Sequence, residues 1–269
     1  MSGAGDHAAP VETVSPLIDL SGKVAIVTGG SKGIGRSIAL SMVRAGASVM
    51  IVSRKREALE AVAAEMPGAP IAVFPGNVGD PDVAEACVAA TLERFGSVDI
   101  LVNNAATNPF AGESIDIDIA RFDKTVQVNL RGPLVWTQAA YRGWMRDHSG
   151  SVINLVSIGA FKHESMIGIY NVTKAALVHL TKVLAAELGP AVRVNALCPG
   201  LVKTDFARAL WEGNEAAVGS KLPLRRLGTP SDLAGGALFL ASDLASWMTG
   251  EVLTIDGGAL VAPAPGRRG

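Results

Sequence analysis

Short runs of β-branched and other apolar residues alternate along the chain with longer segments in which apolar residues recur at helical spacing. The first such pair is VAIVT, within residues 23–29, followed by residues 33–45, where Ile34, Ile38 and Met42 would share one helix face. Runs this short and this apolar are typical of strands buried on both faces of a sheet. Strands are predicted in this way at 23–29, 48–53, 71–74, 99–102, 151–156, 193–198 and 251–255, and helices at 33–45, 56–66, 81–95, 118–147, 170–188 and 231–241.

The regular alternation of strand and helix predicts βαβ units and a parallel sheet. We therefore expect one α/β domain, a Rossmann-like doubly wound parallel sheet of about seven strands flanked by helices. The domain is expected to span residues 21–262, between flexible tails at 1–20 and 263–269. The helix at 81–95 should end at Gly96 as its C-cap, and the long helical pattern at 118–147 should be interrupted at Gly132 and Pro133.

Composition removes several other classes of protein. Apolar residues make up 49% of the 269 residues, which is too many for a disordered chain. The 24 basic and 25 acidic residues give a net charge of -1, so a nucleic-acid partner is not expected. No apolar run is long enough for a membrane span, and the first twenty residues contain no Lys or Arg, so no secretory signal is expected. With two cysteines in no CxxC pattern, we expect a soluble cytoplasmic protein with packed thiols.

A glycine-rich segment lies between the first predicted strand and the first predicted helix. Thr28 is followed by GGSKGIG, a G-x-x-x-G-x-G spacing in the strand–turn–helix context of a dinucleotide site. Glycine lets the backbone approach a pyrophosphate, and the free N–H groups of a helix N-terminus attract its charge. The alternative is an ordinary glycine-rich turn. The pattern predicts a cofactor site that includes Gly29, Ser31, Lys32, Gly33, Ile34 and Gly35.

The end of the second predicted strand distinguishes between the two nicotinamide dinucleotides. An NAD site places a carboxylate there to accept a hydrogen bond from the ribose 2′-hydroxyl. This chain has Ser53, Arg54 and Lys55 instead, and Lys32 adds a cation from the glycine loop. Arginine pairs bidentately with a 2′-phosphate, which a carboxylate would repel. These residues favour NADP(H) over NAD(H). The alternative is that the basic residues after the strand are only the solvated start of the next helix, in which case NAD(H) is the cofactor.

Tyr170 and Lys174 are four residues apart at the start of a predicted helix, so their side chains share a face. Ser157 follows the fifth predicted strand, at the sheet edge where doubly wound folds bind ligands. A nearby ammonium group lowers the pKa of a tyrosine, which then serves as a general acid or base. An isolated pair of this kind is usually a surface pair, but the chain has only 2 tyrosines. We predict a catalytic Tyr170 beside Lys174, with the Ser157 hydroxyl binding a substrate carbonyl oxygen.

Over about residues 20–260 the sequence resembles the classical short-chain dehydrogenase/reductase family. The segments that carry the resemblance are TGGSKGIG from Thr28, NNAA from Asn103, PG from Pro199 with Thr204, IDGG from Ile255, and the single residues Asn129, Ser157, Tyr170 and Lys174. The resemblance implies that Tyr170 exchanges a proton with the substrate oxygen, while Ser157 orients and polarises that oxygen. Lys174 would lower the Tyr170 pKa and hold the nicotinamide ribose, and Asn129 would anchor a water that continues a proton relay. It also implies a homotetramer, and a cofactor site extended by Asn77, Val78, Asn104, Ala105, Tyr170, Lys174, Pro199, Gly200, Val202 and Thr204.

Two positions depart from the family pattern. Asn77 stands where the family has an acid before Val78, although an amide can also accept a hydrogen bond from the adenine amino group. Ala106 stands where the family's NNAG segment has its glycine. Residues 103–112, 199–211 and 224–228 resemble the NADPH-dependent retinol/carbonyl reductase branch, which implies an apolar carbonyl or alcohol substrate. Bacterial 3-oxoacyl-carrier-protein reductases share much of this pattern. The alternatives are therefore a 3-oxoacyl-carrier-protein reductase, an NAD-dependent alcohol dehydrogenase and a non-catalytic NADP(H)-binding protein. The last is disfavoured because all four catalytic positions of the family, Asn129, Ser157, Tyr170 and Lys174, are present.

A substrate lid is expected at about residues 203–225. Phe206 and Trp211 within it offer apolar surface, and His163 and Met166 precede the catalytic tyrosine, so these four side chains are candidates for the substrate pocket. Trp211 has the alternative of packing against the protein's own helices. The four histidines show no metal-ligand spacing, and no metal is expected.

Overall fold

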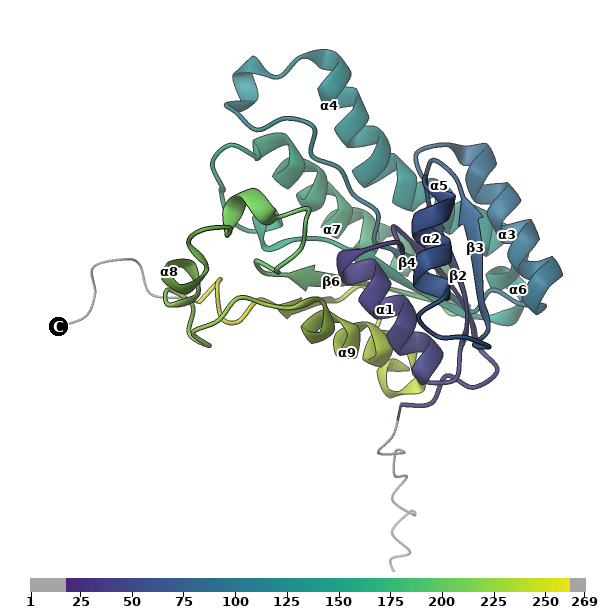
Figure 1. Cartoon of the computed structure of the whole chain (residues 1–269). Helices are drawn as coiled ribbons and strands as arrows, with labels where there is room; N and C mark the ends of the chain where they lie inside the picture. Colours follow the sequence, from purple (N-terminus) through teal and green to yellow (C-terminus); the bar gives the residue numbers. More distant parts are fainter. Residues whose placement is uncertain (1–17, 262–269) are drawn as a thin grey trace, which may run out of the picture.

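A seven-stranded parallel sheet forms the centre of the computed structural model, which describes residues 18–261 (Figure 1). The strands are β1 Val24–Thr28, β2 Ser48–Ser53, β3 Ile71–Pro75, β4 Ile100–Asn103, β5 Gly150–Leu155, β6 Val192–Pro199 and β7 Val252–Ile255. Their order across the sheet is β3-β2-β1-β4-β5-β6-β7. The chain therefore starts near the middle of the sheet, winds outward to β3, and then builds the other half from β4 to β7. This confirms the predicted doubly wound α/β fold.

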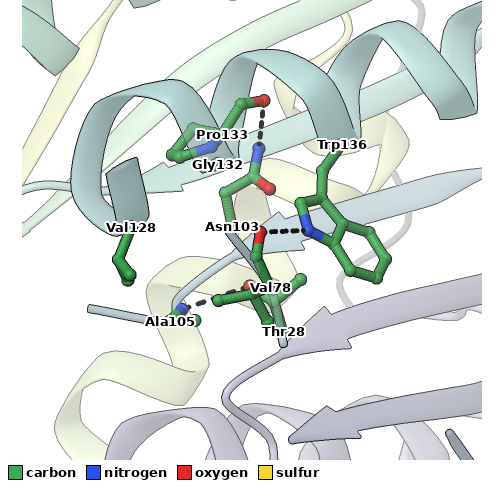
Figure 2. Close-up of a pocket in the computed structure, with 8 residues that line it drawn as sticks. All are labelled: Thr28, Val78, Asn103, Ala105, Val128, Gly132, Pro133 and Trp136. Atoms are coloured by element: carbon green, nitrogen blue, oxygen red, sulfur yellow. Dashed lines mark hydrogen bonds between the residues drawn. The ribbon is translucent and has the colours of Figure 1, made fainter. Parts of the chain in front are cut away.

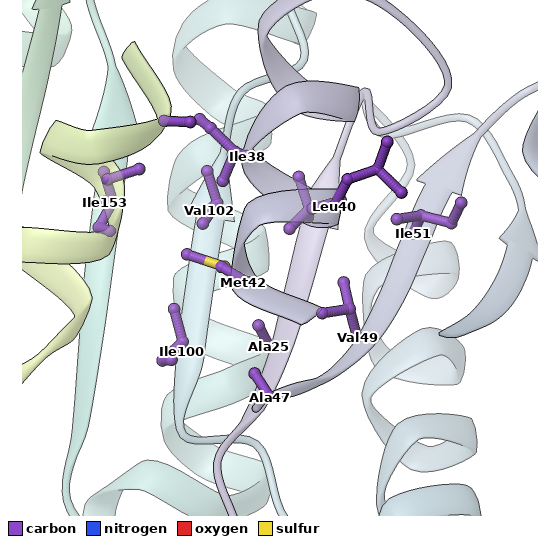
Figure 3. Close-up of a cluster of buried hydrophobic side chains, with 14 of the residues drawn as sticks. Ala25, Ile38, Leu40, Met42, Ala47, Val49, Ile51, Ile100, Val102 and Ile153 are labelled. Atoms are coloured by element: carbon purple, nitrogen blue, oxygen red, sulfur yellow. The ribbon is translucent and has the colours of Figure 1, made fainter. Parts of the chain in front are cut away.

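Helices cover both faces of the sheet. One face carries α1 Gly33–Arg44, α2 Arg56–Ala63 and α9 Pro230–Ala241, and the other carries α3 Pro81–Phe95, α5 Gly132–Ala140 and α7 Gly168–Leu188. Figure 3 shows the first layer, where Ile38 and Met42 of α1 lie toward Val102 and Ile100 of β4; Val49 and Ile51 of β2 belong to the same cluster. Because β1 and β4 are buried along their whole length, their sequences are continuous apolar runs. The remaining helices are α4 Ile119–Val126, α6 Arg146–His148 and α8 Glu215–Gly219.

The helical pattern at 118–147 forms one continuous helical segment, so the expected interruption at Gly132 and Pro133 is wrong. A π-helical turn at Gln127–Arg131 joins α4 to α5, and a second one at Tyr141–Met145 joins α5 to α6. In a regular α-helix a proline ring clashes with the carbonyl group four residues earlier. The wider π turn just before Pro133 accommodates the ring, so the chain continues without a break.

Smaller differences lie at the ends of elements. α2 ends at Ala63 and not at 66, while α7 begins at Gly168, before the predicted start at Tyr170. Gly96 caps α3 in the left-handed conformation, with φ 87°, as predicted. Leu20 was assigned to the N-terminal tail, but it is only 1% exposed and its N–H donates to Ala45 O at 2.7 Å. Residues 1–17 and 263–269 of the two predicted tails lie outside the described residues.

Parallel strands bring the segments that follow them to one edge of the sheet. The glycine loop after β1, the cations after β2, Asn104 after β4, Ser157 after β5 and Gly200 after β6 all leave the sheet at this edge. This is the edge where open α/β sheets bind ligands. Among the helices of residues 18–261, none combines the length and the apolar character of a membrane span.

Candidate active site

The glycine loop turns sharply from β1 into α1. Gly29 and Gly33 have φ of +67° and +56°, values that residues with side chains rarely adopt. A Cβ atom on Gly35 would lie 2.3 Å from Asn104 Nδ2 and 2.5 Å from Gly29 O, so no side chain fits there. Lys32 caps α1 without a side-chain hydrogen bond, which leaves N–H groups of the first turn available to a ligand. The loop, with half-buried Ser31 and Ile34, therefore has the shape and polarity of a phosphate site.

Thr28 and Asn104 tie this loop to β4. Thr28 Oγ1 accepts hydrogen bonds from the N–H groups of Asn104, at 3.0 Å, and Ala105, at 3.1 Å. Asn104 Nδ2 donates to Thr28 O at 2.9 Å and to Gly29 O at 3.2 Å. Figure 2 shows the bond between Thr28 and Ala105. Thr28 is absent from the predicted site residues, although it opens the TGGSKGIG segment that carries the family resemblance.

The loop also lies against the end of β2. The N–H groups of Gly29 and Gly30 donate to Val52 O, at 2.8 Å and 3.2 Å. Val52 directly precedes Ser53 and the predicted cations. The structure therefore brings the glycine loop and the basic segment to the same place, although they are separated in sequence by a whole helix and strand.

Lys32, Arg54 and Lys55 are exposed at this place. Between residues 18 and 261, none of the three forms an ion pair with a carboxylate. Arg56, the next residue, instead faces Glu60 on its own helix, at 3.6 Å. The positive charge of the first three is thus free to meet an anionic ligand.

Asn77 and Val78 follow β3, beside the basic segment. Asn77 is exposed, and its Oδ1 accepts a hydrogen bond from Gly79 N at 3.2 Å. Val78 is held by its carbonyl oxygen, which accepts from Trp136 Nε1 at 2.9 Å (Figure 2). The Asn77 amide therefore retains its Nδ2 donors and one acceptor lone pair for an adenine base.

Tyr170 and Lys174 lie in the first turns of α7 and face the end of β5. Lys174 Nζ is 5.6 Å from the centroid of the Tyr170 ring and donates to Leu155 O at 2.6 Å. Ser157 Oγ accepts from Gly159 N at 3.2 Å, and the Ser157 hydroxyl lies close enough to the Tyr170 phenol to lower its pKa. The structure therefore brings together the three predicted side chains Ser157, Tyr170 and Lys174.

Burial dominates the electrostatics of this cluster. It raises the pKa of Tyr170 well above its ordinary value, and the hydrogen bond from Ser157 offsets this only in part. It also lowers the pKa of Lys174 to about 8. The direction of the Tyr170 shift is opposite to the expected one, because desolvation of the phenolate is the largest effect and the Glu164 carboxylate also disfavours the charged form. Tyr170 is consequently a neutral phenol at neutral pH, and therefore a proton donor.

Asn129 lies in the π-helical turn before α5, and its side chain is fully buried. Its Oδ1 accepts from Thr107 N at 2.8 Å, and its Nδ2 donates to Thr107 O at 2.9 Å and Thr173 Oγ1 at 3.2 Å. Thr173 Oγ1 donates in turn to Tyr170 O at 2.7 Å. The Asn129 side chain thus fastens the loop after β4 to the turn of α7 that carries Tyr170. The sequence pattern carries no signal for Thr107 or Thr173.

The segment after β6 closes the other side of the glycine loop. A Cβ atom on Gly200 would lie 2.7 Å from Asp256 Cα, which explains why glycine stands there. Val202 is buried, and Thr204 approaches the loop so closely that a Cβ atom on Gly33 would be 3.3 Å from Thr204 Cγ2. The segment after β6 therefore approaches the glycine loop at Thr204.

Phe206, in the segment predicted to form a lid, packs near Tyr170. The centroids of the Phe206 and Tyr170 rings are 5.8 Å apart, with the ring planes tilted by 45°, and Phe206 is 52% exposed. Trp211, in contrast, donates from Nε1 to Thr204 O at 3.4 Å, within the lid itself. Of the predicted pocket residues, Phe206 therefore lies next to Tyr170, whereas Trp211 is bonded within its own segment.

The two remaining pocket candidates lie between β5 and α7. Met166 is 53% exposed with φ 69°, a strained conformation for a residue with a side chain, and its carbonyl oxygen accepts from Gly112 N at 3.0 Å. His163 is exposed in the same segment. Met166 thus joins two loops that border the site, and within residues 18–261 His163 has no hydrogen-bond partner that would fix it there.

The two cysteines stay outside this chemistry. Cys87 and Cys198 are buried and free, and burial raises the pKa of each thiol to about 12. Both are therefore uncharged and unreactive at neutral pH. In the part of the chain described, no three His, Cys, Asp or Glu side chains are grouped so that they could hold a metal ion.

Comparison with known proteins agrees with this geometry. A family model described as Enoyl-(Acyl carrier protein) reductase matches residues 29–259. Dehydrogenase/reductase SDR family member 4 of Oryctolagus cuniculus is 43% identical over 245 residues, which cover 89% of this chain and 94% of the relative.

Solved structures share the fold over nearly the whole chain. A short-chain type dehydrogenase/reductase from Mycobacterium marinum has a TM-score of 0.86 and 35% identity, covering 91% of this chain and 98% of that one. A structure described as an NAD(P) dependent gluconate 5-dehydrogenase from Beutenbergia cavernae, with bound NADP at low occupancy, has a TM-score of 0.83 and 34% identity, covering 91% and 99%. The fold, the glycine loop and these similarities together place the chain in the classical short-chain dehydrogenase/reductase family of oxidoreductases.

Proposed function

We propose that this protein transfers a hydride between NADP(H) and a carbonyl or secondary alcohol substrate, with Tyr170 as the general acid and base. The observation that carries the proposal is the convergence of Ser157, Tyr170 and Lys174 at the edge of the sheet that also holds the glycine loop. In this arrangement a proton donor would lie next to the dinucleotide.

The residues around the glycine loop fit a phosphorylated dinucleotide. A pyrophosphate could approach the backbone closely at Gly35, where no Cβ atom fits. The free N–H groups at the start of α1 would bind its charge. Lys32, Arg54 and Lys55 would hold the 2′-phosphate, because they are exposed, unpaired within residues 18–261, and close to the loop. The relative from Beutenbergia cavernae with bound NADP supports this preference. When bound, the cofactor supplies the hydride; the residues of the chain bind and orient the reactants.

Tyr170 would donate its proton to the substrate oxygen during reduction, since burial keeps the phenol protonated. Ser157 would hold that oxygen by a hydrogen bond. Lys174 would bind the nicotinamide ribose and restore the proton of Tyr170, for which a pKa of about 8 suits it. Asn129 would keep α7 and the loop after β4 in place and, through water, continue the proton path.

The substrate would be an apolar carbonyl compound or the corresponding alcohol. Phe206 and Met166 present apolar surface around Tyr170, and both are about half exposed. The relatives named Dehydrogenase/reductase SDR family member 4 match nearly the full length of the chain, which supports an oxidoreductase activity. A 3-oxoacyl-carrier-protein reductase activity is the second candidate, favoured by the description of the matching family model.

We further propose a homotetramer in the cytoplasm. Apolar side chains on α4 and α7 are exposed to an extent that suits burial between subunits: Ile119 at 72%, Val172 at 59% and Val183 at 37%. Two buried, free cysteines agree with a reducing compartment. Light scattering of the purified protein tests the tetramer, and a monomeric mass would refute it.

A panel of ketones, aldehydes, alcohols and 3-oxoacyl thioesters, assayed with NADPH, NADH and their oxidised forms, tests the reaction. We expect reduction of apolar ketones with a marked preference for NADPH. Tyr170→Phe should abolish turnover while leaving NADPH binding intact, because it removes only the phenolic hydroxyl that donates the proton. Turnover by this variant at the wild-type rate would refute the role of Tyr170, and the lack of any wild-type turnover would favour a non-catalytic NADP(H)-binding protein.

A further inference from the structure

A chain of buried polar side chains lies beneath the reaction centre. Asn103 Nδ2 of β4 donates to Asn154 Oδ1 of β5 at 2.9 Å, and Asn154 Nδ2 donates to Thr181 Oγ1 of α7 at 3.0 Å. Asn154 and Thr181 are completely buried, and Asn103 is 3% exposed. Polar groups at such depth are retained at a cost unless every partner is satisfied, so their presence in an apolar layer needs a reason.

Thr181 lies on the same face of α7 as the catalytic residues. Tyr170, Lys174, Leu177 and Thr181 follow at intervals of four, three and four residues, which is the spacing of one helix stripe. This stripe faces β5 at three levels: Ser157 meets Tyr170, the carbonyl oxygen of Leu155 accepts from Lys174, and Asn154 donates to Thr181. Of these levels, only the last has no part in the proposed chemistry.

The apolar contacts of α7 do not define its position along β5 sharply. Leu177 and Leu184 bury apolar surface against the sheet, and such burial depends on area far more than on direction. A hydrogen bond is directional and weakens steeply when its atoms move by a fraction of an ångström. The bond from Asn154 to Thr181 is therefore a contact, additional to that of Lys174 with Leu155 O, that can fix the height of α7, and with it the height of Tyr170 and Lys174.

We propose that Asn154 and Thr181 are positioning residues, whose hydrogen bond holds α7 along β5 so that Tyr170 and Lys174 meet Ser157 and Leu155 O. The proposal rests on the proposed function for its catalytic consequence. Asn103 completes the arrangement, since its Nδ2 occupies Asn154 Oδ1 and thereby turns the Asn154 Nδ2 group toward α7. Misplacement of a catalytic group by about 1 Å can lower turnover by up to about a hundredfold.

The test compares Thr181→Val with Thr181→Ser and with a matched threonine elsewhere. Thr91 of α3 is also completely buried, and its Oγ1 donates to Cys87 O at 2.7 Å, as Thr181 Oγ1 donates to Leu177 O at 2.8 Å. Thr91→Val therefore removes the same hydroxyl and the same helical bond, but at a place away from the site. The measured quantities are kcat, KM, the pH profile of kcat, the Kd of NADPH and the melting temperature.

We expect Thr181→Val to lower kcat by about tenfold and to shift the pH profile of kcat by about half a unit, with KM and the Kd of NADPH changed by less than about twofold. Thr181→Ser, which keeps the hydroxyl, should restore both kcat and the profile. Thr91→Val should lower the melting temperature but leave kcat and its pH profile unchanged. Equal effects of Thr181→Val and Thr91→Val on kcat and its pH profile would overturn the proposal, as would equal loss of kcat in Thr181→Ser and Thr181→Val.

Two further measurements separate this proposal from the proposed function. A crystal structure of Thr181→Val should show the bond between Lys174 Nζ and Leu155 O lengthened, and an unmoved α7 would contradict the proposal even if the wild type turned over no substrate. Should Thr181→Val fail to fold, Thr181→Ala removes the same acceptor from Asn154 with less bulk, and the same outcomes decide.

Discussion

Lys174 donates a 2.6 Å hydrogen bond to the carbonyl oxygen of Leu155 and is almost completely buried, at 2% exposure. The ammonium group is thus removed from water with a single backbone acceptor as its partner on β5. Burial of this kind disfavours the charged form, which is why the pKa of Lys174 falls to about 8.

Lys174→Met should stabilise the protein at neutral pH even though it abolishes activity. Between about pH 8 and the ordinary value of 10.5, the unfolded chain binds a proton at this lysine that the folded chain does not. The lowered pKa therefore costs stability below about pH 8, and the penalty disappears as the pH rises toward 10.5. We expect a gain in the free energy of unfolding of about 1–3 kcal/mol at neutral pH, smaller at high pH.

Thermal unfolding at neutral pH and above pH 10 measures this difference. Lys182→Met provides the control, because Lys182 lies exposed on the same helix and its loss should leave the melting temperature unchanged at both pH values. The same gain for Lys174→Met at both pH values would show that titration of the lysine is not its source.

Gly35→Ala should destroy the cofactor site and destabilise the fold. The added Cβ atom would lie 2.5 Å from Gly29 O, which is backbone and cannot move without distorting the loop. A cost of about 2 kcal/mol or more in the free energy of unfolding is expected, together with loss of NADPH binding in a fluorescence titration. Gly235→Ala is the matched control: Gly235 lies exposed in α9 with no atom within 4 Å of its Cβ position, so a gain of about 0.5–1 kcal/mol is expected. Tight NADPH binding by Gly35→Ala would exclude the loop as the phosphate site.

Arg54→Asp should shift the cofactor preference toward NADH. A charged hydrogen bond to a phosphate contributes about 1.5–3 kcal/mol, so kcat/KM with NADPH should fall roughly 10- to 100-fold while that with NADH is kept or rises. Arg94→Asp changes an exposed arginine at the end of α3, which points to the opposite edge of the sheet, and should leave the ratio as it is. Steady-state kinetics with both cofactors decides, and an unchanged ratio in Arg54→Asp would exclude Arg54 as the phosphate ligand.

Phe206→Ala should weaken the binding of apolar ketones. The ring lies 5.8 Å from that of Tyr170 and presents about half of its surface to the site. Removal of this surface should raise KM by roughly tenfold while kcat changes little, because an apolar wall stabilises ground state and transition state alike. Leu224→Ala, at an exposed apolar position further along the lid, should leave KM unchanged. If KM rose equally in both variants, the cause would be a less stable lid and not the loss of the Phe206 ring from the pocket, which would contradict the prediction.

Most of the fold is predictable because its signals are local. Buried parallel strands are mostly apolar, so β1, β2 and β4 are visible as short apolar runs that end in a polar residue. Gly96 marks the end of α3 by the left-handed conformation that it adopts. The failures arise where a local signal is overridden. Pro133 normally breaks a helix, but a π-helical turn makes room for it, and Leu20 has tail-like neighbours although the core buries it.

The candidate site divides in the same way. Tyr170 and Lys174 form a local pair, and the glycine loop and Arg54 stand at positions defined by strand ends, so the sequence by itself determined the candidate chemistry, the cofactor class and the edge of the sheet where both would lie. Only the tertiary structure decided that the phenol of Tyr170 titrates above and not below its ordinary pKa, since desolvation depends on every element packed around it. It also decided which polar residues support the site: Thr28, Thr107 and Thr181 act through partners far away in sequence, and hydrogen bonds of that range leave no periodic pattern along the chain.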